Sequence, residues 1–379
     1  MIWMAAILVF GLFLAWANGA NDNFKGVATL YGSKTASYKK ALIWTTIATI
    51  LGSMTALFFA QELIIVFKGK GLVPDEVMAL KEFPVAVGLG AATTVMLATK
   101  FGLPVSTTHA LIGALAGAGW IASSAGINFE KLMAKFFLPL IGGPLISFLL
   151  VLMIYPLFKF FKKKLGAKEN TCLCVGSKVL HTQPGILRTV EEFRDSVEGS
   201  VSLPFISVGE EAYCRSSYSG RAFGISLGKI LDGLHYLSGG LVSFSRGLND
   251  TPKIAALLLL GSRFSLTFSI LLVGIFMMVG GIVQSRKIAE TMGNKLTEMN
   301  PGQAFSANLV TGIMVFGASR VGVPVSTTHV SCGSIFGIGA ASKQAHWKVI
   351  GQVLLAWVTT LPLGALLGLM AMVLLQYFS

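Results

Sequence analysis

Two aspartates lie in nearly identical short motifs in two apolar parts of the chain. Gly-Ala-Asn-Asp ends at Asp22, and Gly-Leu-Asn-Asp ends at Asp250. Ionisable groups at membrane depth are costly, so they are functional candidates. A carboxylate can bind a hard cation such as Na⁺ together with amide and backbone oxygens, or it can carry a proton. The candidate cation ligands are therefore Asn21, Asp22, Asn249 and Asp250.

The glycine that precedes each Asn-Asp pair allows a helix to unwind there and to free backbone groups for ligands. The alternative is an interfacial helix cap, since Asn and Asp are ordinary capping residues. For one copy we would favour the cap, and the second copy favours function.

A second pair of motifs carries hydroxyl groups. Gly-Leu-Pro-Val-Ser-Thr-Thr-His begins at Gly102, and Gly-Val-Pro-Val-Ser-Thr-Thr-His begins at Gly322. Proline suits a first helical turn, and the hydroxyls after it can donate hydrogen bonds. With the free N–H groups of a half-helix N-terminus they predict an oxyanion site that needs no fixed positive side chain. The alternative is that they bond back to helix carbonyls. The hydroxyl residues are Ser106, Thr107, Thr108, Ser326, Thr327 and Thr328.

Two lysines and two histidines lie next to these motifs. Lys25 and Lys253 each follow their aspartate by three residues, and could neutralise the carboxylate, touch an anion or extend to a membrane interface. His109 and His329 end the hydroxyl motifs, where we favour hydrogen-bonded packing over a proton relay.

The surrounding composition is that of a membrane protein. Of 379 residues, 54% are hydrophobic and 12% charged, and the mean hydropathy is +0.72, whereas soluble domains are about one-quarter charged. The net charge of +13 lies mostly in loops between apolar runs, so it indicates cytoplasmic loops and not nucleic-acid binding. About ten membrane spans are expected. They are Met1–Asn21, Ala41–Gln61, Phe83–Thr99, Phe101–Phe129, Phe136–Phe158, Ile225–Ser245, Phe264–Ser285, Met299–Ser319, Val321–Ser342 and Val349–Ser379.

The distribution of Lys and Arg predicts the orientation in the cell (plasma) membrane. Basic clusters near Lys39, Lys163, Lys287 and Lys348 all fall inside if both termini are outside. This topology places a long polar insertion, residues 159–223, in the cytoplasm.

An internal repeat decides the expected architecture. The Asn-Asp motifs align Asn21 with Asn249, and the hydroxyl motifs align Pro104 with Pro324, in the same order along the chain. Five spans per half is an odd number, so the second half must enter the membrane in the opposite direction. We therefore predict an all-α polytopic membrane protein of two inverted-topology repeats, residues 1–158 and 224–379, with 10 to 12 membrane segments and broken or re-entrant helices at a midplane site.

These paired motifs and the central insertion resemble the inorganic phosphate transporter family. The resemblance covers both membrane halves and implies a cation-coupled symporter, driven by Na⁺ or H⁺, that works as a homodimer. It implies that phosphate binds the Asn-Asp and Ser-Thr residues of both repeats, with Thr108 and Thr328 close behind. The sequence departs from the family pattern after each aspartate, where Lys25 and Lys253 follow.

Other functions are weaker. A permease for another oxyanion such as sulfate would use the same fold, but sulfate has no proton to donate to an aspartate at neutral pH. An anion channel would not need coupling-ion carboxylates. A membrane phosphatase would need histidines with Arg or carboxylate partners in a recognisable catalytic spacing. This sequence lacks such a spacing, so we expect no enzymatic activity.

Overall fold

The computed structural model describes residues 2–59, 61–123, 126–164, 171–179, 202–210, 223–260 and 264–378. The chain divides into two compact units. The first contains Met1–Pro156 and His235–Ser379, and the second contains Leu157–Leu234. The predicted insertion, residues 159–223, falls within the second unit.

The regular elements described in the first unit are helices. Its N-terminal part contains α1 (Ile2–Asp22), the 3₁₀ turn η1 (Asn23–Gly26), α2 (Ala28–Gly32), α3 (Tyr38–Phe59), α4 (Gln61–Phe67), α5 (Asp75–Ala79), α6 (Glu82–Lys100), α7 (Thr107–Ala122), α8 (Phe129–Lys131), the π-helical η2 (Leu132–Phe137) and α9 (Leu138–Lys164). Its C-terminal part contains α12 (Leu227–Leu259), α13 (Leu266–Gln284), α14 (Arg286–Glu290), the π-helical η3 (Thr291–Lys295), α15 (Pro301–Arg320), α16 (Thr327–Ser342) and α17 (Trp347–Tyr377). Helices α9 and α12 continue into the second unit.

Six segments of the described chain are long and apolar enough to cross a membrane. They are Ile2–Gly26, Tyr38–Phe59, Glu82–Lys100, Phe129–Phe158, Leu266–Gln284 and Trp347–Tyr377. Each corresponds to one of the ten expected spans. The expected spans Phe101–Phe129 and Val321–Ser342 instead contain α7 and α16, with 16 residues each. At 1.5 Å per residue such a helix is about 24 Å long, which is shorter than the hydrocarbon core of about 30 Å.

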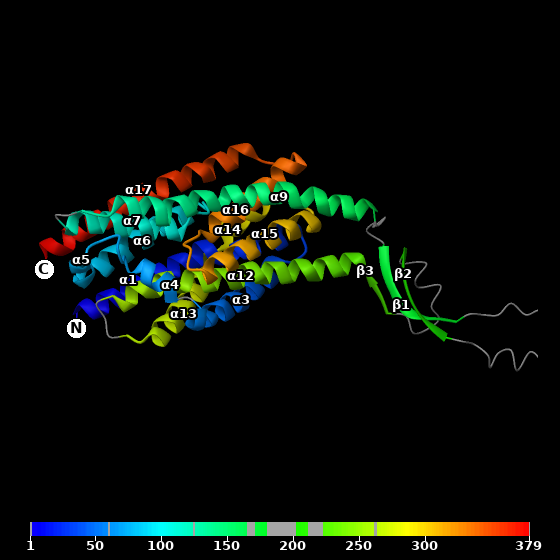
Figure 1. Ribbon diagram of the computed structural model, residues 1–379, viewed down its shortest axis with the longest axis horizontal. Coiled ribbons are helices and arrows are strands. Elements are labelled where there is room, and N and C mark those ends of the chain that lie inside the picture. Colours follow the sequence, from blue (N-terminus) through cyan, green and yellow to red (C-terminus); the bar gives the residue numbers. More distant parts are fainter. Residues whose placement is uncertain are drawn as a thin grey trace, which may run out of the picture. The chain divides into compact units, whose positions relative to one another are not determined.

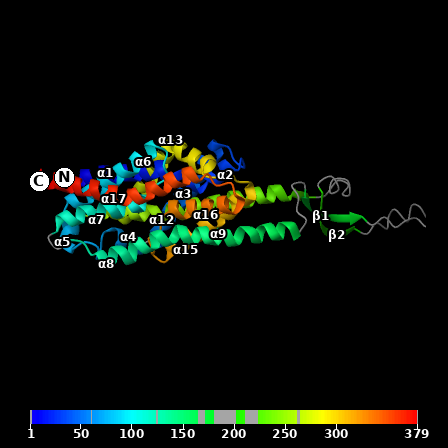
Figure 2. The same ribbon diagram turned by 90° about the horizontal axis from the view of Figure 1, so that it is seen from above.

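Helices α6 and α7 form one hairpin, and α15 and α16 form another. Figure 1 shows α6 and α7 toward the end of the bundle that carries both chain termini, and α15 and α16 farther from those termini; Figure 2 agrees. Each hairpin turns at a glycine with positive φ, Gly102 at +70° and Gly322 at +71°. The N–H groups of Leu103 and Val323 then bond back to Ala98 O and Ala318 O at 3.0 Å, which is the hydrogen bond of a Schellman helix end. The glycines in the two predicted hydroxyl motifs therefore end the first helix of each hairpin.

The two repeats also pack in matching ways. A side chain at Gly19 of α1 would overlap the carbonyl oxygen of Met277 in α13, and one at Gly247 of α12 would overlap that of Thr49 in α3. These two glycines hold the same position in the two Asn-Asp motifs. Small residues let two backbones approach closely inside a membrane bundle. The pairs α1–α13 and α12–α3 thus position the two Asn-Asp motifs by the same kind of contact.

The helix does not unwind equally at the two Asn-Asp motifs. In the first motif α1 ends at Asp22 and continues as the 3₁₀ turn η1. The second motif lies inside α12, which is helical from Leu227 to Leu259 with Pro252 in its interior. The unwinding expected at Gly247 is therefore wrong, and that expected near Gly19 takes the form of a change of helix type.

The described residues of the second unit include three strands, which the polar composition of the insertion did not predict. The central strand β1 (Thr171–Val179) pairs antiparallel with β2 (Ser202–Glu210) and β3 (Phe223–Ser226). The all-α class therefore describes the first unit and not the insertion.

Candidate functional site

The tips of the two hairpins meet inside the first unit. Thr328 Oγ1 donates a hydrogen bond of 2.8 Å to Val105 O, and Thr108 Oγ1 lies 3.4 Å from Val325 O. Each threonine thus contacts the extended segment of the other repeat. The predicted hydroxyl motifs are brought together, and a buried polar cluster surrounds them.

The carboxylate of Asp22 lies in this cluster, and groups from its own repeat bind it. Lys25 Nζ forms an ion pair with Asp22 Oδ1. Thr107 Oγ1 donates to Asp22 Oδ2 at 3.1 Å, and Asn18 Nδ2 donates to the same oxygen at 3.0 Å. The carboxylate has 2% of its residue surface exposed, so these groups replace water as its partners.

Asp250 has the equivalent place in the second repeat. Lys253 Nζ lies 3.4 Å from Asp250 Oδ1, and Thr327 Oγ1 lies 3.5 Å from Asp250 Oδ2. Two further groups bind it, Asn249 Nδ2 at 3.0 Å and Asn18 Nδ2 at 3.3 Å. Asn18 therefore contacts both carboxylates and joins the two halves of the cluster.

The two predicted asparagines attach each Asn-Asp motif to the hairpin of its own repeat. Asn21 Nδ2 donates to Thr99 Oγ1 at 2.8 Å, and Val105 N donates to Asn21 Oδ1 at 3.1 Å. In the second repeat Ser319 Oγ donates to Asn249 Oδ1 at 3.3 Å. Thr99 and Ser319 hold the same position relative to the glycine that opens each hydroxyl motif. Both asparagines therefore hold a hairpin in place.

An arginine that the sequence analysis did not single out lies at the centre of the cluster. Arg246 is fully buried, and its Nη2 donates to Asn18 Oδ1 at 2.7 Å while its Nη1 donates to Asn23 Oδ1 at 2.9 Å. Its Nε lies 3.8 Å from Asp250 Oδ2 and has no hydrogen-bond partner among the described residues. Arg246 and Asn18 each directly precede the glycine of an Asn-Asp motif, so the two occupy equivalent positions. The available signal was a charged residue inside an apolar run, four positions before an aspartate.

The formal charge of this cluster is positive. In their ionised forms Asp22 and Asp250 contribute −2, while Lys25, Lys253 and Arg246 contribute +3, which leaves +1. All five residues have 3% or less of their surface exposed. Unpaired buried charge is costly, and one excess positive charge favours an anionic ligand. This differs from the predicted oxyanion site without a fixed positive side chain.

Both predicted lysines point inward. Lys25 and Lys253 have 1% of their surface exposed and bind their aspartates. The alternative in which they extend to a membrane interface is therefore wrong, and the alternative in which they neutralise the carboxylates describes their contacts.

The six predicted hydroxyl residues divide into three pairs. Ser106 and Ser326 cap α7 and α16 by accepting from the N–H groups of His109 and His329, at 3.0 and 3.2 Å. Thr107 and Thr327 face the aspartates, whereas Thr108 and Thr328 contact the opposite repeat. Each serine thus caps the third N–H of its helix, whereas the two earlier N–H groups of each helix have no partner within the helix.

The rings of the two histidines contact each other from the first turns of α7 and α16. The ring centroids of His109 and His329 are 4.4 Å apart, and His329 lies 3.8 Å from Trp357. His329 Nδ1 is 2.6 Å from Ser326 Oγ, while His109 Nδ1 has no partner among the described residues. The ring contacts agree with the favoured packing interpretation for both histidines, whereas the expected side-chain hydrogen bond is found at His329 Nδ1 and not at His109 Nδ1 among the described residues.

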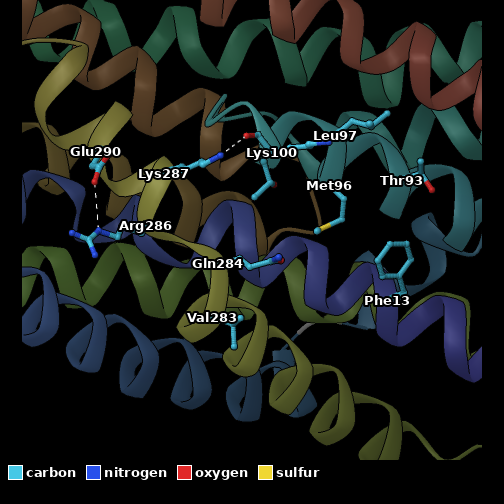
Figure 3. Close-up of a pocket in the computed structure, with 11 residues that line it drawn as sticks. Phe13, Thr93, Met96, Leu97, Lys100, Val283, Gln284, Arg286, Lys287 and Glu290 are labelled. Carbon is cyan, nitrogen blue, oxygen red and sulfur yellow. Dashed lines mark hydrogen bonds and ion pairs between the residues drawn. The ribbon is translucent and has the colours of Figure 1, made fainter.

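A separate cleft of about 780 Å³ lies beside the cluster, between α1, α6, α13 and α14. Figure 3 shows Lys287 directed at Lys100, where its Nζ donates to the lysine carbonyl oxygen at 2.9 Å, and Arg286 paired with Glu290. Thr99 lines this cleft and also accepts a hydrogen bond from Asn21, so it contacts both the cleft and the Asn-Asp motif.

This chain matches a known protein family over most of its length. A family model described as the phosphate transporter family matches residues 18–368. A protein of Thermococcus kodakarensis named as a putative phosphate permease is 26% identical over 97% of this chain and 96% of its own length. Inorganic phosphate transporter 2-1 of Arabidopsis thaliana, a chloroplast protein, is 25% identical over 96% of this chain and 70% of its own.

A solved structure shares the fold. The protein described as the sodium-dependent phosphate transporter superposes with a TM-score of 0.75 over 100% of both chains, at 20% sequence identity. The family resemblance predicted from the paired motifs is confirmed, as is a helical membrane fold. The family is one of transporters and not of enzymes, as predicted.

Proposed function

This chain belongs to the phosphate transporter family, and we propose that it imports inorganic phosphate across the plasma membrane by secondary active symport. The observation that carries the proposal is the buried cluster at the hairpin tips, with its formal charge of +1 and its contributions from both repeats. Arg246 and the N-termini of α7 and α16 supply positive potential for an anion.

Phosphate would lie between the two hairpin tips. Hydroxyl and backbone N–H groups of the Ser-Thr-Thr segments would donate to its oxygens. A protonated phosphate oxygen can in turn donate to a carboxylate, whereas sulfate carries no proton at neutral pH. Asp22 and Asp250 therefore favour phosphate over sulfate, which is the second candidate substrate.

Uptake of divalent phosphate needs a driving force. Each elementary charge that crosses 100 mV corresponds to about 2.3 kcal/mol, so two negative charges entering a negative interior cost about 4.6 kcal/mol. Cotransport of a cation, Na⁺ or H⁺, would offset this cost. Binding of Na⁺ at Asn21, Asp22, Asn249 and Asp250 stays a prediction.

Alternating access would come from one hairpin and its repeat moving against the other, with the site at their interface. The matching helix contacts of the two repeats and the different ends of the bundle from which the hairpins extend support inverted topology. Both termini outside, a cytoplasmic insertion and a homodimer with one pathway per subunit belong to the same proposal.

The test is uptake of labelled phosphate into proteoliposomes under an inward Na⁺ gradient, an inward proton gradient, or neither. Accumulation under one of the gradients, undiminished by excess unlabelled sulfate, is expected. Displacement by sulfate would assign the second candidate substrate. A signal that only equilibrates with the medium, under every gradient, would indicate a channel and contradict symport.

A further inference from the structure

The side-chain nitrogen of Lys25 is enclosed by oxygen atoms. It donates to Asn21 Oδ1 at 2.7 Å, to Val105 O at 2.8 Å and to Thr328 Oγ1 at 2.6 Å, and it binds Asp22 Oδ1. These four oxygens belong to an amide, a backbone carbonyl, a hydroxyl and a carboxylate. We call them the first oxygen cage.

Lys253 occupies an equivalent cage in the second repeat. Its Nζ donates to Thr108 Oγ1 at 2.8 Å and to Val325 O at 2.7 Å, and it lies 3.4 Å from Asp250 Oδ1. The ring of Phe67 faces the same nitrogen at 5.5 Å. We call these three oxygens the second oxygen cage.

The two cages are related by the internal repeat. Each contains its own repeat's aspartate and extended-segment carbonyl, together with the threonine of the opposite hairpin. Carboxylates, unwound backbone carbonyls and hydroxyls at a helix break are the ligands that secondary transporters use for coupling Na⁺. The cages thus have the chemistry of two Na⁺ sites, and each contains an ammonium group.

A Na⁺ ion and an ammonium group cannot share one cage. Lys25 and Lys253 have 1% of their surface exposed, and each ammonium group occupies its cage in this structure. Two positive charges at contact distance in a water-poor interior repel strongly. With both lysines present, the carboxylates are already neutralised and Arg246 supplies the excess positive charge.

We propose that Lys25 and Lys253 act as tethered cations in the two places where coupling Na⁺ would bind, so that phosphate binding needs no Na⁺ there. The proposal rests on the phosphate site proposed above. It replaces the predicted Na⁺ role of the Asn-Asp pairs with lysine binding.

This arrangement has a consequence for energy coupling. A tethered charge returns with the protein in every transport cycle, so it carries no net charge across the membrane. A Na⁺ gradient therefore does no work through these two cages. The proposal therefore assigns the driving role to H⁺, the other candidate ion.

The first experiment measures phosphate affinity of the wild-type protein by titration calorimetry, in Na⁺ buffer and with choline replacing Na⁺. A coupled Na⁺ site would change the affinity by about 5- to 150-fold, so we expect the two dissociation constants to agree within about twofold. Affinity that is lost in choline would overturn the tethered-cation proposal and leave the phosphate site intact. Failure to bind phosphate in both buffers would instead contradict the proposed function.

The second experiment opens or fills the cages. Lys25→Ala and Lys253→Ala remove the ammonium and leave its oxygens, whereas Lys25→Met and Lys253→Met fill the space without a charge. We expect Na⁺, but not choline, to restore phosphate binding and to raise the thermal midpoint of the alanine variants, and to do neither for the methionine variants. Lys348→Ala, which removes an exposed lysine of α17, is the control.

The thermal midpoint tests the cages without phosphate. Equal Na⁺ stabilisation of the wild type and the alanine variants would show that Na⁺ binds elsewhere and would overturn the proposal. The same holds if Na⁺ rescues the methionine variants.

Discussion

The two halves of the polar cluster share three contacts around their lysines, an aspartate, a backbone carbonyl and a threonine of the opposite hairpin, and they differ at the position four residues before each aspartate. Asn18 in the first half is replaced by Arg246 in the second, and these two side chains bond to each other at 2.7 Å. Duplication thus accounts for two similar cages, whereas the divergence of one residue accounts for the excess positive charge. The common features position the hairpins, and the difference favours an anion.

The halves also differ in how firmly each lysine is held. Lys25 has four oxygen partners, while Lys253 has three and an aromatic face. The first motif lies where α1 changes to a 3₁₀ turn, whereas the second lies within the continuous helix α12. The first cage therefore surrounds its lysine nitrogen with more oxygen atoms than the second cage does.

The largest effect is expected from removing either carboxylate. Asp22→Asn or Asp250→Asn leaves a buried lysine without its anionic partner, which costs about 3–5 kcal/mol of stability and abolishes phosphate uptake. The double variant Asp22→Asn/Lys25→Met should regain thermal stability without uptake. Near-normal uptake by either single variant, reconstituted at equal protein density, would remove that aspartate from the mechanism.

The next largest effect concerns the position at which the halves differ. Arg246→Met removes the excess positive charge, and we expect phosphate affinity to fall by about 10- to 100-fold, as for a lost hydrogen bond to a charged group. Arg246→Lys should retain part of the affinity, because the charge remains. Calorimetric titration with phosphate measures both.

The control variant for the loss of the Arg246 charge is Arg286→Ala, which removes an arginine outside the cluster. Arg286 is 80% exposed and pairs with Glu290 at the surface, where such pairs contribute about 0–1 kcal/mol. If Arg286→Ala weakens phosphate binding as much as Arg246→Met does, the excess charge in the cluster is not what attracts phosphate.

A third test examines the feature that the halves share. Gly19→Ala and Gly247→Ala each place a methyl group against a backbone carbonyl of a neighbouring helix. Overpacking of this kind costs about 1–3 kcal/mol, and we expect both variants to lower the thermal midpoint by similar amounts. Gly351→Ala, with no atom within 4 Å of the added carbon, should not be destabilised. A variant at one of the two glycines that unfolds like the wild type would show that the repeats pack differently.

The smallest expected difference is between the two threonines that face the aspartates. Thr107 donates to Asp22 at 3.1 Å and accepts from Asn18 at 3.1 Å, whereas the corresponding contacts of Thr327 with Asp250 and Asn249 are both 3.5 Å long. A net hydrogen bond contributes about 0.5–1.5 kcal/mol, so Thr107→Val should weaken phosphate binding by about tenfold and Thr327→Val by less. Titration of the two valine variants side by side measures the order, and the reverse order would contradict the comparison.

The sequence predicted the residues of the cluster better than their contacts. Two copies of each motif were sufficient to identify both aspartates, because a repeated motif can be recognised in the sequence without knowledge of the structure. The inward direction of Lys25 depends on its contacts with Val105 and Thr328, which are far away in the sequence. The pattern of residues along one helix therefore could not predict this direction. Arg246 was missed because its equivalent, Asn18, is uncharged and the pair therefore does not appear as a repeated motif.

The same reasoning applies to the fold. Long apolar runs predicted the helices that can cross a membrane, because hydrophobic length alone decides them. The runs that contain Gly102 and Gly322 looked long enough to span, but these positive-φ glycines end the preceding helices, and the next helices begin only at Thr107 and Thr327. The strands of the insertion were not predicted, since that segment has a polar composition and no repeated motif.

The central claim is that both repeats bind one phosphate ion, and a structure determined by electron cryo-microscopy in the presence of phosphate tests it most directly. The account predicts tetrahedral density at the hairpin tips, within hydrogen-bond distance of groups from both α7 and α16. Density bound to one repeat alone, or in the cleft beside Lys100 and Lys287, would contradict it.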